Sequence, residues 1–130
     1  IPEAKILTGY SISNKEDMIK AAKKIINMGP KNVLLKGGHL KKKMIFDILA
    51  TKKGIKVFGV RKIRTKNTHG TGCTLSSAIT TCLSQKKNIV KSCKVSLRYV
   101  DKAIISAPGY GEGFGPLNHL VSFNLKNIDV

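Results

Sequence analysis

The chain has 130 residues, of which 42% are apolar, and it carries a formal net charge of +17. This length and composition predict one small domain with a packed core and exclude an intrinsically disordered chain. No apolar run reaches the roughly 20 residues that a membrane span needs. No secretory leader with a basic start and an apolar centre is recognisable, so we expect no membrane partner.

Lysine supplies nearly all of the positive charge, because only Arg61, Arg64 and Arg98 are arginines. Specific recognition of phosphates and bases favours arginine, whose guanidinium binds bidentately. Three tyrosines and no tryptophan offer little surface for stacking on single strands. We interpret the charge as a lysine-biased composition and do not expect a nucleic-acid partner, with a basic nucleic-acid-binding module as the alternative.

The three cysteines are Cys73, Cys82 and Cys93. Their odd number and the absence of a close CxxC pair argue against a disulfide framework and against a zinc site. A reducing, cytoplasmic setting fits this pattern best. Cys82 and Cys93 fall on apolar helical faces and are expected in the core.

The first predicted element is a helix. Ser13 and Glu16 have the spacing of a capping box, and Gly29-Pro30 ends the helical pattern. Its apolar face carries Met18, Ala21, Ala22, Ile25 and Ile26.

Three short strands are predicted next, over residues 32–35, 44–49 and 56–60, from apolar or alternating runs. Asp47 interrupts the second run and would need a partner if it is buried. Helical periodicity then returns over residues 74–83 and 90–107, and the glycine-rich tail is irregular. Helix, strands and helices in this order predict an α/β fold.

The segment Gly70-Thr71-Gly72 runs directly into Cys73, where the helix is expected to begin. Glycines there let successive N–H groups point at one anion, and the helix dipole adds partial positive charge. A thiolate at Cys73 could take a proton from a substrate hydroxyl or act as a covalent nucleophile. The alternative is a small residue that only packs after a turn. The segment is neither a Walker A loop nor a Rossmann fingerprint.

Residues 67–76, "NTHGTGCTLS", closely resemble the signature of the hydroxymethylpyrimidine/phosphomethylpyrimidine kinases, the thiamine-pathway members of the ribokinase-like family. Three further stretches agree with this family in order and spacing. They are "PEA" followed by "LTG" (2–9), "VLLKGGH" (33–39) and "GFGPLNH" (113–119).

The resemblance implies a mostly parallel central sheet flanked by helices. It implies that residues 1–130 are the C-terminal portion of a single kinase domain, with the pyrimidine-binding residues mostly in an N-terminal half. The implied reaction uses ATP and Mg²⁺ to phosphorylate 4-amino-5-hydroxymethyl-2-methylpyrimidine and then its monophosphate. Gly70, Thr71 and Gly72 would form the anion hole, and Cys73 would stand where related sugar kinases carry an aspartate base.

Other positions match the family individually. Lys36 would bind the ATP phosphates, and Glu3 would organise Mg²⁺ and phosphate through water. Asn67 and His69 would shape the glycine turn, and His119 would be structural. His39 would cap the loop after Gly38.

The family relation leaves two hypotheses for the chain itself. It is either the nucleotide and catalytic half of a kinase, or a piece that exists alone as an inactive remnant or a basic binding module. A homo-oligomer is one way in which the half could assemble a working site.

Overall fold

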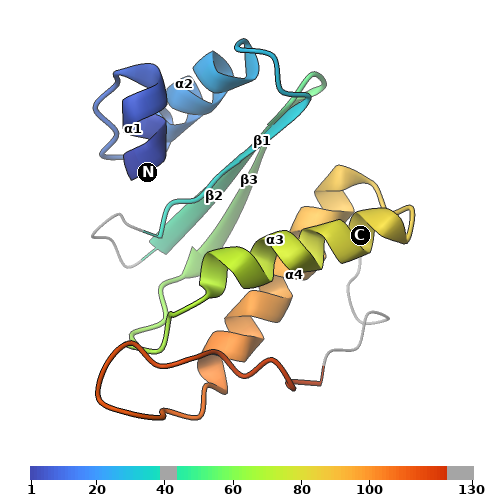
Figure 1. Ribbon diagram of the computed structural model, residues 1–130. Helices are drawn as coiled ribbons and strands as arrows, with labels where there is room; N and C mark the ends of the chain where they lie inside the picture. The colour runs from blue at the N-terminus through green and yellow to red at the C-terminus, as the bar shows by residue number, and fades with distance from the viewer. Residues whose placement is uncertain (39–43, 123–130) are drawn as a thin grey trace. The chain divides into compact units, whose positions relative to one another are not determined.

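The computed structural model describes residues 1–38 and 44–122 (Figure 1). The chain divides into two compact units, Ile1–Lys62 and Ile63–Val130. His39, for which we predicted a loop-capping role, lies outside the described residues. Within the described ranges, no helix has the length and apolar character needed to cross a membrane.

The first unit confirms the α/β class, with two helices and a three-stranded sheet. Its elements are α1 (Pro2–Thr8), α2 (Lys15–Ile26), β1 (Asn32–Leu35), β2 (Met44–Thr51) and β3 (Gly54–Arg61). All three predicted strands are present, in the spatial order β1-β2-β3.

Both strand pairs in this sheet are antiparallel, whereas the resemblance implied a mostly parallel sheet. The short β2–β3 connection explains the difference for that pair. Thr51 pairs with Gly54, so two residues form the turn, and parallel strands require a much longer crossover. The Thr51 hydroxyl accepts from the N–H of Lys53 at 3.1 Å, which holds the turn closed.

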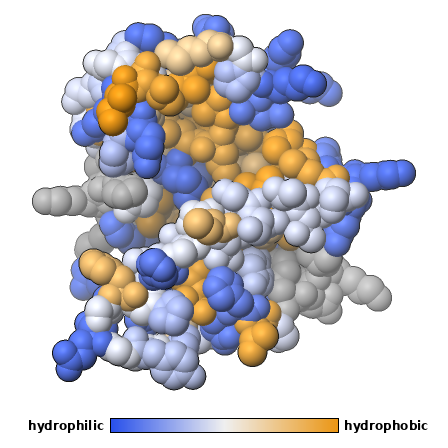
Figure 2. Space-filling view, viewed as in Figure 1, coloured by the Kyte–Doolittle hydropathy of each residue, from blue (hydrophilic) through white to orange (hydrophobic). Residues whose placement is uncertain are grey.

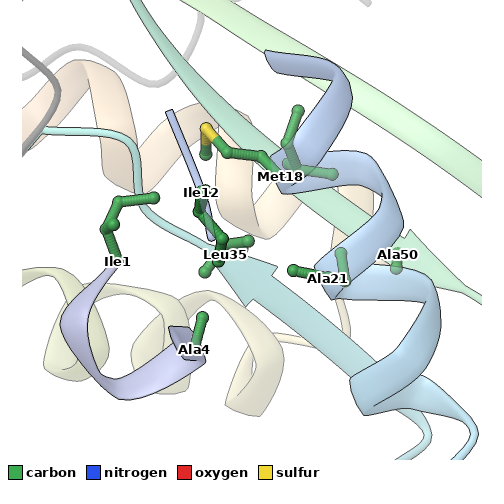
Figure 3. Packing of buried hydrophobic residues seen from close by; sticks show 9 residues of the cluster. Ile1, Ala4, Ile12, Met18, Ala21, Leu35 and Ala50 are labelled. Atoms are coloured by element: carbon green, nitrogen blue, oxygen red, sulfur yellow. The ribbon is translucent and has the colours of Figure 1, made fainter. Parts of the chain in front are cut away.

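The core of the first unit lies between α2 and one face of the sheet (Figures 1 and 3). Met18, Ala21 and Ala22 on α2 are fully buried, as the helical periodicity predicted. They pack in one cluster with Ile48 and Ala50 of β2. The other buried members of this cluster are Leu35 of β1 and, near the start of the chain, Ile1, Ala4 and Ile12.

Helix α1 was not predicted from the sequence. Its seven residues are too few for a periodic pattern, although its end signals are present. Pro2 stands in the first turn, where its missing N–H is not needed, and Gly9 closes the helix in the left-handed region with φ 69°. The Lys24 ammonium also donates to the carbonyl of Thr8 at 2.7 Å, which satisfies an acceptor at the helix end.

The predicted capping box of α2 is displaced by one residue. The N-cap is Asn14, and not Ser13, because the Asn14 side-chain oxygen accepts from the N–H of Asp17 at 2.9 Å. Asp17 in turn accepts from the N–H and hydroxyl of Ser13, at 3.0 and 2.9 Å. Asp17 thus returns its bonds to Ser13, the residue before the N-cap, and not to the N-cap itself as in a capping box. Glu16 remains an exposed residue of the first turn.

The second unit contains α3 (Thr71–Ser84), α4 (Ile89–Ile105) and the closing segment that follows them. Both helices were predicted, but α3 begins three residues before the expected start at Thr74. Cys82 of α3 packs against Val95 of α4 in a small buried cluster. Cys82 and Cys93 are buried, which confirms their expected place in the core.

Candidate active site

The glycine turn forms the start of α3. Gly70 is the N-cap and adopts the left-handed conformation with φ 82°, which a residue with a Cβ rarely adopts. The first helical hydrogen bond joins the N–H of Thr74 to the Gly70 carbonyl at 2.9 Å. The three residues between them, Thr71, Gly72 and Cys73, therefore have N–H groups with no acceptor inside the helix.

This helix start is suited to bind an anion. No side chain caps it, and the Thr71 N–H makes only a long contact of 3.4 Å with the Thr68 carbonyl. The helix dipole places partial positive charge at the same position. Successive N–H groups at a helix start of this kind are the usual phosphate-binding arrangement in proteins.

Cys73 is the third residue of α3, and its thiol is exposed. It lines a groove of about 750 Å³ that is formed within the second unit. Four residues later along the helix, Ser77 and then Thr81 line the same groove, because residues four apart share a helix face. The far wall comes from α4, with Val95, Ser96 and Tyr99. The four-residue spacing of Cys73, Ser77 and Thr81 is visible in the sequence and predicts that these side chains share one face of the helix.

The closing motif braces the glycine turn. The N–H of His69 donates to the carbonyl of Gly115 at 3.2 Å, and His69 and Pro116 form a parallel bridge. The same motif is fixed to α4 by the hydroxyl of Tyr99, which donates to the carbonyl of His119 at 3.0 Å. These contacts use the backbone of both histidines, and the structural roles expected for their side chains stay predictions. Both histidines also contribute to the lining of the groove.

Asn67 packs beside this brace. Its side-chain oxygen is buried and lacks a hydrogen-bond partner within the described residues. A Cβ added at Gly115 would collide with that oxygen, so the close approach requires glycine at position 115. The contact joins Asn67 to the closing motif, and its expected role in shaping the turn stays a prediction.

Lys36 follows directly on β1 and forms an ion pair within the first unit. Its ammonium lies 3.2 Å from the Asp47 carboxylate, and the two side chains are 43% and 5% exposed. The other Asp47 oxygen accepts from the N–H of Gly37 at 2.9 Å. The sequence indicated that a buried Asp47 would need a partner, but not that Lys36 would be that partner.

Glu3 lies in the first turn of α1 and is largely exposed, with 81% of its side chain accessible. Its carboxylate is 3.5 Å from the Ile1 amino group. The predicted site residues thus fall in both units. Glu3 and Lys36 belong to the first unit, and Gly70, Thr71, Gly72 and Cys73 form one continuous helix start in the second.

Comparison with known proteins places these features in a family. Residues 1–118 match the family model described as phosphomethylpyrimidine kinase. A thiamine biosynthesis bifunctional protein, ThiED, from Geobacter sulfurreducens is 44% identical over 122 residues, which are 94% of this chain and 25% of that protein. The hydroxymethylpyrimidine/phosphomethylpyrimidine kinase of Staphylococcus aureus is 35% identical over 131 residues, covering 99% of this chain and 48% of that protein.

A solved structure agrees with the sequence relatives. The ADP complex of Bacillus subtilis pyridoxal kinase superposes with a TM-score of 0.84 and 32% identity, over 90% of this chain and 46% of that one. The fold is therefore that of the ribokinase-like kinases. Within that class, the chain belongs to the phosphomethylpyrimidine kinase family. It spans about half the length of the kinases that it matches, and a quarter of the bifunctional protein.

Proposed function

We propose that this chain supplies the phosphoryl-transfer part of an ATP-dependent hydroxymethylpyrimidine/phosphomethylpyrimidine kinase. The observation that carries this proposal is the start of α3. An uncapped helix N-terminus and an exposed thiol meet there, at the edge of a groove. Phosphoryl transfer depends mainly on positioning and on neutralising charge, and this arrangement is suited to both.

The residues of the glycine turn have distinct roles in the proposal. The N–H groups after Gly70 receive the oxygens of the transferred phosphoryl group, which stabilises their developing charge. Cys73 accepts the proton of the substrate hydroxymethyl group as the oxygen attacks phosphorus. The hydroxymethyl oxygen forms a bond to the γ-phosphorus as the bond from that phosphorus to the bridging oxygen breaks, so that ADP leaves and the proton of the hydroxyl group passes to the Cys73 sulfur.

Nucleotide binding has two proposed contributors. Ser77 and Thr81 of α3 bring hydroxyl groups to the groove beside Cys73, and the similar pyridoxal kinase was solved with ADP. Lys36 supplies a partly exposed ammonium, which suits a phosphate ligand because lysine acts as a point charge.

Mg²⁺ would neutralise phosphate charge when it is bound with ATP. In the described ranges, no three His, Cys, Asp or Glu residues form a group that could hold a metal ion. We therefore propose that Mg²⁺ is held chiefly by nucleotide phosphates and water, the usual arrangement for this ion. The exposed Glu3 carboxylate would then contact the ion through water.

The proposed setting is the cytoplasm, with ATP and a small pyrimidine as partners. Since the chain spans about half of its kinase relatives, a working pyrimidine site requires residues from elsewhere. A second copy of this chain is one source, so we propose a homo-oligomer as one active form.

The test is a mass-spectrometric assay of the purified chain with ATP, Mg²⁺ and hydroxymethylpyrimidine, with pyridoxal as a parallel substrate. If the chain forms no product, the assay is repeated with the part of the Staphylococcus relative that this chain does not cover, which the resemblance implies is its N-terminal half. Mono- and diphosphorylated pyrimidine in either format supports the proposal. No product in both formats contradicts it and favours an inactive remnant, and a product from pyridoxal alone would reassign the substrate.

Two variants assign the roles in this assay. Cys73→Ala should lower turnover by about 10²–10⁴, the usual effect of losing a positioned base. Thr80→Ala is the matched control, because Thr80 is an exposed residue of the same helix whose hydroxyl donates to the carbonyl of Ser76 in that helix. Lys36→Ala should weaken the use of ATP, and an unchanged response to ATP would remove Lys36 from the site.

A further inference from the structure

The buried carboxylate of Asp47 has no role in the reaction proposed above. It lies on β2 and is 4% exposed. A carboxylate at such a position is costly to bury unless its oxygens are paired. Both oxygens are paired here, one with the Lys36 ammonium at 3.2 Å and the other with the Gly37 N–H at 2.9 Å.

The strand register explains why these groups meet. Leu35 is the last residue of β1 and pairs with Ile48, so the chain leaves the sheet beside Asp47. A Cβ at Gly37 would collide with the carbonyl of Phe46, which shows how closely the backbone after Lys36 follows β2. Asp47 therefore fixes both the side chain of Lys36 and the backbone immediately after it.

We infer that Asp47 is a positioning residue, which holds the Lys36 ammonium in place to receive an anionic phosphate oxygen. This inference rests on the proposed role of Lys36 in binding ATP. Lysine has a long side chain whose rotamer freedom is costly to restrict. One N–H directed at a buried carboxylate anchors the head group, and the exposed part of the ammonium remains available to a ligand. The remaining N–H donors of the ammonium suit an oxygen anion.

The chain contains a matched comparison for this pair. Lys15 lies 3.6 Å from Glu16, with side chains 41% and 68% exposed. The two lysines are equally accessible, and their partners differ, since Asp47 is buried and Glu16 is not. Lys15 also lies 5.6 Å from the centre of the Phe46 ring. An exposed pair is weakly coupled and is screened by salt, so Glu16→Gln is the control for Asp47→Asn.

The experiment measures the acetylation rate of each lysine by peptide mass spectrometry, using N-acetoxysuccinimide on the whole chain. Asparagine retains an acceptor for the Gly37 N–H, so Asp47→Asn removes the ion pair with little change to the backbone. We expect Lys36 to react about three- to tenfold faster in Asp47→Asn, whereas Lys15 changes less than about twofold in Glu16→Gln. An unchanged Lys36 rate overturns the inference.

The same measurement with ATP and Mg²⁺ separates the two proposals. ATP should slow the acetylation of Lys36 in the unaltered chain, and most of this protection should be lost in Asp47→Asn at the same ATP concentration. No protection in the unaltered chain contradicts the ATP role of Lys36, and with it the inference. Equal protection in both proteins overturns the positioning role alone.

Folding of the variant is checked by circular dichroism. If Asp47→Asn does not fold, the positioning role of Asp47 is tested by measuring acetylation rates in the unaltered chain at increasing NaCl concentrations. The acetylation rate of Lys36 should then stay constant while that of Lys15 rises with NaCl, because a pair with a buried partner is screened less. Parallel increases at both lysines would overturn the inference.

Discussion

The backbone N–H of His69 donates to the carbonyl of Gly115 at 3.2 Å. This bond joins the segment before α3 to the closing motif, which is distant in the sequence. The start of α3 offers its N–H groups to an anion only if the preceding turn is held in one conformation. The conformation of the glycine turn therefore depends on residues that would not themselves contact a phosphate.

We expect Gly115→Ala to disturb this brace. A Cβ at position 115 would collide with the buried Asn67 side-chain oxygen, and such overpacking usually costs about 1–3 kcal/mol. Gly113→Ala is the matched control, because a Cβ there meets nothing within 4 Å. Urea unfolding of both variants measures the difference, and equal stabilities would show that the Asn67 contact is easily relieved.

The accessibility of Cys73 leads to a second prediction. Cys73 is exposed, whereas Cys82 and Cys93 are buried. Iodoacetamide should modify Cys73 at least about tenfold faster than the other two, since buried thiols react only when the structure opens. Peptide mass spectrometry after short exposures to iodoacetamide gives the modification rates of the three thiols. In urea the three rates should become similar, because unfolding exposes all three. Comparable rates in the folded protein would mean that the thiol at the start of α3 is not accessible.

Most regular elements could be predicted from the sequence because their signals are local. The apolar face of α2 and the strand around Phe58 follow from periodicity alone. Helix α1 was missed because its seven residues leave no periodic pattern. The N-cap was placed one residue early, because Ser13 and Asn14 are both good caps and only the bonds of Asp17 distinguish them.

The site was predictable only where its residues are adjacent in the chain. The turn from Gly70 to Cys73 is one continuous segment, so its glycines predict the start of a helix from the sequence alone. The pairing of Lys36 with Asp47 and the packing of Asn67 on Gly115 are tertiary contacts, which depend on strand register and on the path of the closing motif. A single sequence contains no direct record of such contacts.

The charge of the chain leads to a third prediction. Lysines dominate the +17 charge. On the face drawn in Figure 2, hydrophobic residues in orange form a broad area in the upper half of the view, with hydrophilic residues in blue at its margins. We expect any binding to DNA to be non-specific and to be lost at about 200 mM salt, because such binding would come from counterion release alone. Fluorescence anisotropy with two unrelated duplexes measures this. Sequence preference that persists at that salt concentration would favour a nucleic-acid-binding module instead.

The capping of α2 leads to a prediction about pH. The N–H and hydroxyl of Ser13 donate to the Asp17 carboxylate, and these bonds hold the pKa of Asp17 below its ordinary value of about 3.9. Because the pKa is lowered in the folded state, the stabilisation is complete above the unfolded pKa and disappears as the pH falls through the folded pKa. In urea unfolding, the free energy of unfolding of the unaltered chain should exceed that of Asp17→Asn at about pH 6, and this difference should shrink toward about pH 2.

The control is Glu16→Gln, which alters an exposed ion pair with Lys15. Its free energy of unfolding should differ little from that of the unaltered chain at every pH. A gap between the chain and Asp17→Asn that does not change with pH would mean that the ionised carboxylate is not what stabilises the start of α2.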